Sequence, residues 1–332
     1  MANQKSDMEN LFENIACCKN VRNYFNGVLE GNGKKPHPCG EIIRSQFGLY
    51  DCTYNNYEND CSNFKDNFQI PEPWSGHIDK APLLFLGSNP NIDAGSKDYP
   101  RFKESCCSNS NNSEQNIEKL MNFYNERFNK VKNDTEKNIW NPYWKRVDRM
   151  ASWLYGKEVI SGCDYALSEV VHCKSKVEGG VGKALKECSK KYLKRLLDIR
   201  ISPAKVVVVL GTKTKDALEV YLETEKIIKE DKWKIKLSCQ CPIINKSPKT
   251  CNCDFKIYKQ ININNNNSCR YFIFAYHPSY CKRCYNNNNF IGFIDCSENT
   301  LKITNNKLFQ EIQECLKLIS KKPDCNSEQG SK

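Results

Sequence analysis

Four short apolar segments, separated by helical patterns, constrain the fold of this chain more than any other feature. Each segment ends in polar or turn-forming residues, as buried strands of a mainly parallel sheet do. They cover residues 81–86, 165–171, 205–210 and 271–276. Amphipathic patterns at 116–130, 143–154 and 183–197 predict the intervening helices. Strands that alternate with helices indicate an α/β fold with right-handed crossovers.

Two of these strands run into turns that contain proline. The first reads LFLGSNPN over residues 84–91, and the second reads FAYHPSY over residues 274–280. In open parallel sheets, ligands bind beyond the carboxyl ends of the strands. We therefore expect Asn89 and His277 to lie at this rim and to face one ligand.

The charge of the chain favours a polyanionic partner. Its 332 residues carry a net charge of +11. Residues 174–200 hold nine Lys or Arg and three Asp or Glu, beginning with Lys174 and Lys176. This stretch is either a phosphate-binding surface or an ordinary solvated helix face.

The length allows one large core with small appendages. We expect a helical flank over residues 1–69, one α/β domain over 70–320 with a polar insertion at 231–267, and a disordered tail over 321–332. No signal peptide and no apolar stretch of ~20 residues is evident. The expectation is an intracellular monomer, cytoplasmic or nuclear, with no membrane partner.

Twenty cysteines without a secretory signal favour reduced thiols and metal sites over a disulfide framework. The polar insertion contains two close pairs, Cys239 with Cys241 and Cys251 with Cys253. Four cysteines in two pairs suit a tetrahedral zinc site, although the usual spacing is C-x-x-C. A small polar module often needs a metal to fold, so we expect these four sulfurs to share one zinc ion.

The order of the strand-end motifs resembles that of the uracil-DNA glycosylase superfamily. The motifs are G-S-N-P, V-V-H-C, V-L-G and H-P-S, and the resemblance covers roughly residues 70–319. The segment E-P-W-S-G, residues 72–76, is also similar to one in a set of uncharacterised bacterial proteins. The resemblance implies a three-layer α/β/α domain with a central, mainly parallel four-stranded sheet. We expect residues 81–86 and 271–276 to form neighbouring parallel strands in it.

The resemblance further implies a DNA base-excision glycosylase, which hydrolyses the bond between the sugar and a flipped base. His277 would donate to O2 of the departing base, and Asn89 would position the attacking water. No cofactor is required for this chemistry. The alternatives are a structural histidine and an ordinary Asn-Pro turn.

Base recognition is where the chain departs from the superfamily. Members that excise uracil usually present Asn where this chain has Glu169. An ionised Glu169 suits a base edge with two donors, whereas a protonated one mimics Asn. Alternatively, the alignment is one residue off and Glu169 caps or pairs locally. Phe102, or less favourably Tyr99, would stack on the base.

Residues after the H-P-S motif would contact DNA, single- or double-stranded. Tyr280 could enter the duplex as a wedge, while Lys282 and Arg283 hold the backbone. These assignments leave two functions open. The chain is either a DNA glycosylase or a nucleic-acid-binding or processing protein that keeps the fold without excising uracil.

Cys173 and Cys188 match two of the four ligands of a 4Fe–4S cluster in the iron–sulfur branch of the superfamily. That branch takes its other two ligands from an N-terminal C-x-x-C, which this chain lacks. The N-terminal cysteines have a different spacing; they are Cys17, Cys18, Cys39, Cys52 and Cys61. The alternative is that Cys173 and Cys188 are two small core thiols.

Overall fold

A computed structural model describes most of the chain in eleven segments. These are residues 5–26, 37–46, 65–92, 99–102, 113–128, 142–176, 178–225, 229–241, 249–263, 268–275 and 307–319. Within them, only the backbone is described for residues 113–115, 142, 229–256, 261–263, 268 and 318–319. None of the described helices is long and apolar enough to cross a membrane.

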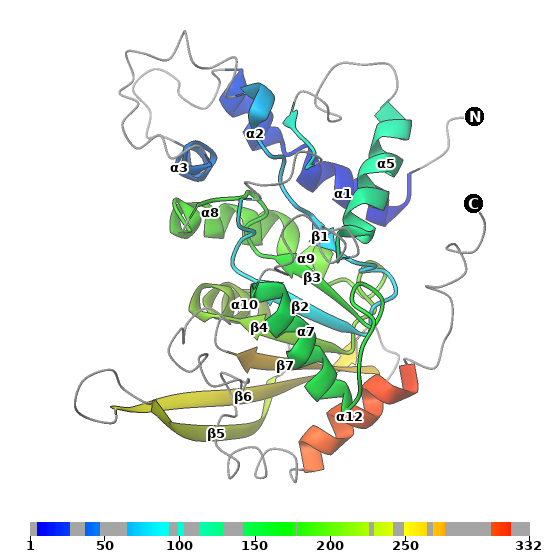
Figure 1. Cartoon of the computed structure of the whole chain (residues 1–332), viewed down its shortest axis with the longest axis vertical. Coiled ribbons are helices and arrows are strands. Elements are labelled where there is room, and N and C mark those ends of the chain that lie inside the picture. Colours follow the sequence, from blue (N-terminus) through cyan, green and yellow to red (C-terminus); the bar gives the residue numbers. More distant parts are fainter. Residues whose placement is uncertain are drawn as a thin grey trace. The chain divides into compact units, whose positions relative to one another are not determined.

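The described residues form a mixed α/β structure around one seven-stranded sheet (Figure 1). The strands lie in the order β1-β3-β2-β4-β7-β6-β5. Their bounds are β1 (Trp74–Ser75), β2 (Leu83–Gly87), β3 (Tyr165–Glu169), β4 (Val206–Leu210), β5 (Lys229–Cys241), β6 (Lys249–Ile263) and β7 (Ser268–Ala275). All four apolar segments of the sequence are therefore strands, as predicted.

Two details of the predicted sheet are wrong. The sheet has seven strands instead of four, and β2 and β7 are not neighbours because β4 lies between them. β4 pairs in parallel with both, so β2 and β7 still run in the same direction. Hydrophobicity identifies a buried strand but does not say which strand lies beside it, which explains the second error.

The central strands are apolar throughout because both of their faces are covered. Val206, Val208 and Leu210 of β4 face a core that includes helices α7 (Pro142–Tyr155) and α12 (Lys307–Ile319). The alternate residues Val207 and Val209 are also fully buried, which places them on the opposite face. A strand exposed on one face would instead alternate between apolar and polar residues.

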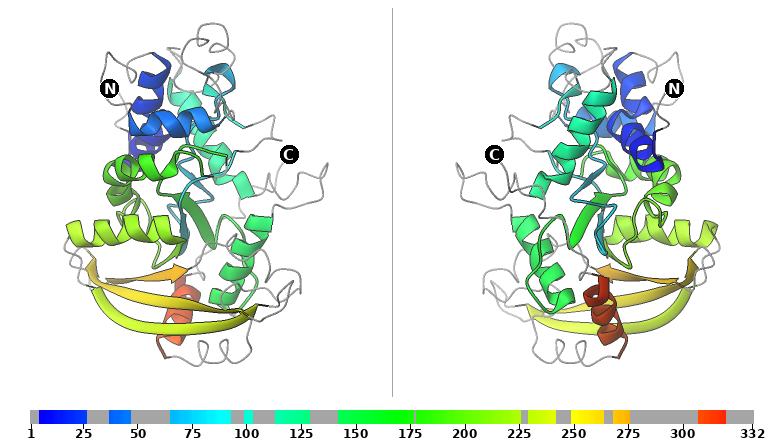
Figure 2. Two further views of the ribbon diagram at one scale, coloured as in Figure 1. Left: turned by 90° about the vertical axis from the view of Figure 1, so that its left-hand side faces the viewer. Right: turned by 90° about the vertical axis from the view of Figure 1, so that its right-hand side faces the viewer.

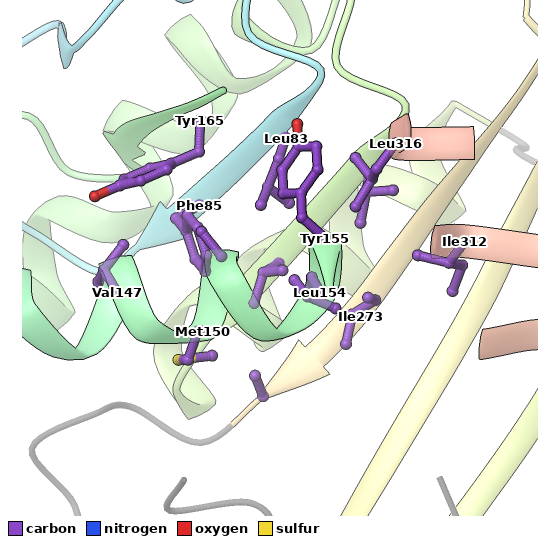
Figure 3. Close-up of a cluster of buried hydrophobic side chains, with 14 of the residues drawn as sticks. Leu83, Phe85, Val147, Met150, Leu154, Tyr155, Tyr165, Ile273, Ile312 and Leu316 are labelled. Atoms are coloured by element: carbon purple, nitrogen blue, oxygen red, sulfur yellow. The ribbon is translucent and has the colours of Figure 1, made fainter. Parts of the chain in front are cut away.

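The core beneath α7 and α12 consists of large apolar side chains from β2, β3, β4 and β7 (Figure 3). Leu83 and Phe85 of β2 lie against Met150 and Leu154 of α7, and Ile273 of β7 lies in the same cluster (Figure 3). An edge-to-face contact between Phe85 and Tyr165, with ring centroids 5.6 Å apart, adds to the packing of this cluster.

The polar insertion is a long antiparallel hairpin that extends the sheet. β5 pairs with β6, and β6 pairs with β7 (Figure 1). Both hairpin strands are long and visibly curved (Figure 2). The sequence predicts a surface insertion without a core of its own, and the structure shows its backbone hydrogen bonds continuing the sheet from β7.

The chain divides into two compact units that are interleaved along the sequence. The first comprises residues 1–75, 87–126 and 168–201, and the second comprises residues 76–86, 127–167 and 202–332. This division does not follow the expected boundary at residue 69, because the N-terminal helices join two later segments in the first unit.

Helices make up much of the first unit. They are α1 (Asp7–Ala16), α2 (Lys19–Phe25), α3 (Pro38–Ser45), α5 (Ser113–Asn125), α8 (Val181–Cys188), the π-helical turn η3 (Ser189–Leu193) and α9 (Lys194–Leu196). α1 begins at a capping box in which the Ser6 hydroxyl accepts from Glu9 N and the Glu9 carboxylate accepts from Ser6 N. α10 (Thr212–Thr224) belongs to the second unit.

The core of the second unit gives a direct test of the fold. Replacing Ile273 with Ala should lower the free energy of unfolding by about 2–5 kcal/mol, because it leaves a cavity between β7 and the helices. Val220→Ala, at a position of α10 that is 63% exposed, is the control and should change stability by less than about 0.5 kcal/mol. Chemical denaturation of both variants checks this. An equal effect at the two positions would contradict the packing described above.

Candidate functional site and thiol cluster

At the carboxyl ends of β2 and β3, the turn that holds Asn89 lies beside the segment that follows Glu169. The amides of Val170 and Val171 donate to the carbonyls of Gly87 and Ser88, at 2.9 and 3.0 Å. The turn after β2 therefore continues beside β3 and carries Asn89 next to the segment that follows Glu169. Asn89 and Glu169, which are 80 positions apart in sequence, therefore lie at one rim of the sheet, whereas the strand-end argument had paired Asn89 with His277.

The side-chain amide of Asn89 is held in place by two acceptors. Its Nδ2 donates to Ser175 Oγ at 2.8 Å and to the carbonyl of Pro90 at 2.9 Å. Ser175 N in turn donates to the same Pro90 carbonyl, at 3.2 Å. The amide is half-buried and cannot rotate without breaking both bonds, so the loop before α8 fixes its orientation.

Glu169 is buried to 4% exposure, and its carboxylate lies against the backbone of Gly87. A side-chain carbon at Gly87 would overlap the Glu169 carboxylate, so this approach requires glycine. Among the described residues, none hydrogen-bonds to Glu169 Oε2. Buried polar atoms are normally paired, which makes an unpaired carboxyl oxygen a candidate for ligand recognition.

The surroundings of Glu169 favour the protonated form of its carboxyl group. Burial raises the pKa of Glu169 well above its ordinary value, and the negative charge of Glu72 raises it further. Lys174 opposes this effect only in part. A neutral carboxyl group can both donate and accept a hydrogen bond, whereas a carboxylate can only accept.

Glu72, in the E-P-W-S-G segment, is the centre of a buried polar network beside Glu169. Its Oε2 forms an ion pair with Lys174 Nζ at 2.7 Å and accepts from Tyr99 OH at 3.1 Å. Its Oε1 accepts from Ser75 Oγ at 2.7 Å. The backbone amide of Glu72 also donates to the carbonyl of His172, at 2.9 Å. Several donors therefore satisfy the buried Glu72 carboxylate, whereas Glu169 Oε2 has none among the described residues.

Lys174 and Tyr99 are both part of this buried network. The side chain of Lys174 is 3% exposed, and its Nζ also donates to the carbonyl of Asn91 at 3.0 Å. The same Nζ lies 4.1 Å from the centroid of the Tyr99 ring. Tyr99 is fully buried, and its hydroxyl lies 3.0 Å from that of Tyr124. To reach a phosphate, Lys174 would have to leave Glu72, and to stack on a base, Tyr99 would have to leave the core.

Phe102 and Lys176 have different surroundings. Phe102 packs against Phe25 of α2, with ring centroids 4.9 Å apart, and Lys65 Nζ lies 5.6 Å from its ring centre. It is 6% exposed. Lys176 is exposed, in the loop that leads to α8. Of the two lysines expected to contact phosphate, Lys176 is the one at the surface.

The remaining predicted site residues fall outside the described part of the chain. These are His277, Tyr280, Lys282 and Arg283. β7 ends at Ala275, two residues before His277, and is parallel to β2 through β4. Their proposed roles remain predictions.

Four buried thiols gather in the first unit, on α3, at the end of α8, in the segment after β3, and between α1 and α2. They are Cys18, Cys39, Cys173 and Cys188, and none of them is in a disulfide. Cys39 and Cys188 hydrogen-bond to each other, which lowers the pKa of Cys39 and raises that of Cys188. Burial, followed by the charges of Cys18 and Cys39, raises the pKa of Cys173.

Other donors point at the same sulfurs. Tyr192 OH lies 3.2 Å from Cys18 Sγ and 2.8 Å from the carbonyl of Asn14, either of which can accept its hydrogen, and Asn20 Nδ2 donates to Cys39 Sγ at 3.6 Å. Tyr192 lies in η3, directly after Cys188. Short π-helical turns often occur at functional sites because they redirect side chains.

Gly180 allows α3 and α8 to approach closely enough for Cys39 to meet Cys188. Its φ is +74°, and a side-chain carbon there would overlap the backbone of Glu41 and Ile42 in α3. Lys183 of α8 forms an ion pair with Glu41 across the same contact. The helix pair is therefore fixed by a close backbone contact and by charge.

The sequence favours reduced thiols over a disulfide framework, and the structure contains both free and disulfide-bonded cysteines. Cys17 and Cys163 are disulfide-bonded. Disulfide formation depends on two sulfurs approaching in the fold, which the sequence does not reveal.

The four cysteines predicted to bind zinc lie on the two strands of the hairpin. Cys239 is the register partner of Cys251, whereas Cys241 pairs with Lys249 and Cys253 pairs with Leu237. Cys241 and Cys253 are thus roughly 13 Å apart along the strands. One zinc ion needs its sulfurs within about 4 Å of each other, so a shared site would require the hairpin to leave this register.

Comparisons with known proteins assign no family. No family model matches the chain, and no curated protein matches it. The function must therefore be argued from the residues at this rim.

Sequence reasoning did not single out Glu72, Ser175, Cys18 and Cys39 as site residues. Glu72 lies in the E-P-W-S-G segment, and the similarity of this segment to one in other proteins was the signal that could have identified it. Cys18 and Cys39 carry no comparable signal, because their spacing matches no ligand motif and they meet Cys173 and Cys188 only in the fold.

The contact between Gly87 and Glu169 makes a testable pair. Gly87→Ala should destabilise the protein, because the new methyl group overlaps the Glu169 carboxylate. Adding Glu169→Ala should recover part of that loss, so the two changes should be clearly non-additive in a double-mutant cycle. Gly182→Ala, where nothing lies within 4 Å of the added carbon, is the matched glycine control. Strict additivity would argue against the contact.

The raised pKa of Glu169 predicts a pH-dependent stability. The unfolded chain ionises Glu169 near pH 4.3, whereas the folded protein holds the proton to a higher pH. Stability from this group is full below the unfolded pKa and is lost as the pH rises through the folded pKa. Glu169→Gln should therefore gain stability relative to the unchanged protein as the pH rises from the unfolded pKa toward the higher folded pKa. The free energy of unfolding of both proteins would be measured across this pH range. A stability difference that does not change with pH would contradict the raised pKa of Glu169.

Proposed function

We propose that this protein is a nucleic-acid base hydrolase, which cleaves the N-glycosidic bond of a flipped base in DNA. The observation that carries the proposal is Glu169, a buried carboxyl group at the end of β3 whose Oε2 has no hydrogen-bond partner among the described residues, beside the turn that holds Asn89. Leaving such a group unpaired is costly to folding. A ligand that pairs with it on binding accounts for its presence.

The protonated state of Glu169 selects the kind of base edge. Its hydroxyl donates to a carbonyl oxygen while its carbonyl oxygen accepts from a neighbouring N–H. This matches the imide edge of uracil and the similar edges of hypoxanthine and xanthine. A guanine-like edge with two donors, which an ionised Glu169 would prefer, fits less well with its raised pKa.

Asn89 is suited to position water. Its Nδ2 is committed to Ser175 and Pro90, which fixes the plane of the amide group. An amide orients water but does not deprotonate it strongly, and hydrolysis through an oxocarbenium-like transition state does not require a strong base. His277 would stabilise negative charge on the departing base.

The net charge of +11 supports a nucleic-acid substrate. Lys176 is exposed at the start of the basic stretch, and the exposed Lys190, Lys194 and Arg200 lie further along it. Basic surface of this kind attracts the phosphate backbone without reading sequence. It is compatible equally with the second candidate function, a DNA-binding or processing protein that keeps the site but excises no uracil.

The two functions are separated by an excision assay. Oligonucleotides carrying uracil, hypoxanthine, xanthine or an alkylated base would be offered as single and double strands, and abasic product would be scored by strand cleavage in alkali. The proposal expects excision of bases with an imide-type edge. Tight binding without abasic product from any substrate would favour the second function.

Variants of the site sharpen the test. His277→Ala should reduce the excision rate roughly 10²–10³-fold, the scale for losing one donor to a developing negative charge, while DNA binding changes little. Glu169→Gln should keep most activity, since an amide also donates and accepts, but Glu169→Ala should lose it. Val220→Ala is the control and should behave as the unchanged protein. Excision that is indifferent to His277 and Glu169 would remove both from the mechanism.

A pH profile distinguishes the two ionisation states of Glu169. If the protonated form binds the base, excision should fall as the pH rises through the raised pKa of Glu169, and Glu169→Gln should abolish that fall. An increase in activity over the same pH range would indicate that the carboxylate is the active form.

A further inference from the structure

We propose that Glu178 is a positioning residue of the candidate site, which holds the turn that carries Asn89 against the loop before α8. Ser88 Oγ donates to Glu178 Oε1 at 2.6 Å. Ser88 is buried and directly precedes Asn89 in the G-S-N-P motif. The inference rests on the proposed function for the role of Asn89, whereas the contact itself can be tested without a substrate.

The backbone of Glu178 adopts a conformation that a residue with a side chain rarely takes. Its φ is +57°, in the left-handed region, and the other positive φ angles among the described residues belong to glycines. A glycine at this position would adopt the same conformation without strain. Other residues keep such a conformation where the surrounding structure fixes it, and these positions cluster at functional sites.

Backbone hydrogen bonds hold this conformation on both sides of Glu178. Gly179 N donates to the carbonyl of Lys176 at 3.0 Å, and Val181 N donates to the carbonyl of Glu178 at 3.3 Å. The second bond joins Glu178 to the first residue of α8. The start of α8 and the turn after β2 are therefore linked through this one residue.

The bond between Ser88 and Glu178 adds to two other contacts that hold the turn after β2. The Ser88 carbonyl accepts from Val171 N at 3.0 Å, and Asn89 Nδ2 donates to Ser175 Oγ at 2.8 Å. Glu178 contributes from the far end of the segment between β3 and α8. Losing its carboxylate would free the turn to shift relative to that segment. A displacement of about 1 Å at a group that orients a reactant can cost about 10²-fold in rate.

The ordinary alternative is a surface carboxylate that happens to bond to a nearby hydroxyl. Glu178 is exposed, and water alone would satisfy an exposed carboxylate. That alternative does not explain why a glutamate occupies a position that favours glycine, directly before Gly179 and Gly180. The bond to Ser88 supplies the reason, because a glycine would fit the backbone but has no carboxylate to reach the hydroxyl.

Glu178 also acts on Glu169 through its charge. Burial raises the pKa of Glu169 most, followed by the charge of Glu72; Lys174 lowers this pKa, and the charge of Glu178 raises it. Glu178→Gln removes the charge but keeps an oxygen that accepts from Ser88. This substitution should therefore lower the pH at which Glu169 loses its proton while it leaves the turn in place.

Thermal denaturation of the full chain tests the contact without a substrate. Glu178→Ala and Ser88→Ala should each lower the melting temperature, and the double variant should lose little more, because both changes remove the same bond. Glu178→Gly should melt above Glu178→Ala, since glycine relieves the strain at a positive φ. Glu187→Ala, at an exposed position of α8, is the matched control and should change little. Strictly additive losses, or a Glu178→Ala variant as stable as Glu178→Gly, would overturn the proposal.

Hydrogen exchange measures the positioning directly. Glu178→Ala should speed exchange of the backbone amides in residues 87–92, which include the turn with Asn89, while α7 and α12 stay protected. Glu178→Gln should leave this exchange as in the unchanged protein, because its amide oxygen still accepts from Ser88. Equal exchange in Glu178→Ala and in the unchanged protein would show that Glu178 does not hold the turn.

Excision kinetics then connect the contact to the chemistry. Glu178→Ala should lower kcat by up to about 10²-fold with little change in KM, because the group that orients water is displaced while the base still binds. Glu178→Gln should restore most of kcat at a pH where Glu169 remains protonated. An unchanged kcat in Glu178→Ala, or no rescue by Glu178→Gln, would overturn the positioning role. If the exchange responds as expected but the unchanged protein excises no base, the failure lies with the proposed function and the contact stands.

Discussion

The buried ion pair between Glu72 and Lys174 is the interaction on which the rest of the candidate site depends. It joins the segment before β1 to the segment after β3, and Tyr99 and Ser75 complete its hydrogen bonds. Removing one partner of such a pair leaves a buried charge, which typically costs about 3–5 kcal/mol. The two partners act in opposite directions on the neighbouring Glu169: burial raises the pKa of Glu169, the charge of Glu72 raises it further, and the charge of Lys174 lowers it.

Two glycines allow the close approaches on which the first unit is built. Gly87 leaves room for the Glu169 carboxylate beside β2, and Gly180 leaves room for α3 beside α8. The first contact shapes the proposed base-recognition site, and the second brings two thiols together. Both depend on the absence of a side chain, and each can be tested by adding a single carbon.

The proposed base site and the thiol cluster share the segment between β3 and α8. Glu169 begins this segment, Cys173 and Lys174 follow, and Ser175 holds the amide of Asn89. In this segment Cys173 belongs to the thiol cluster, whereas Glu169, Lys174 and Ser175 belong to the proposed base site.

The sequence by itself determined the four buried strands and the helices between them, because hydrophobic periodicity records which residues face a core. It also placed Asn89 at a strand end, since polar residues after apolar runs mark the rim of a sheet, whereas the structure decided that β3 ends at Glu169. Only the tertiary structure decided that β4 separates β2 from β7, and that the polar insertion extends the sheet through β6. Strand neighbours are set by backbone pairing between distant segments, which composition does not encode. The same reason applies to Cys18 and Cys39, whose spacing has no meaning until the N-terminal helices pack against α8 and η3.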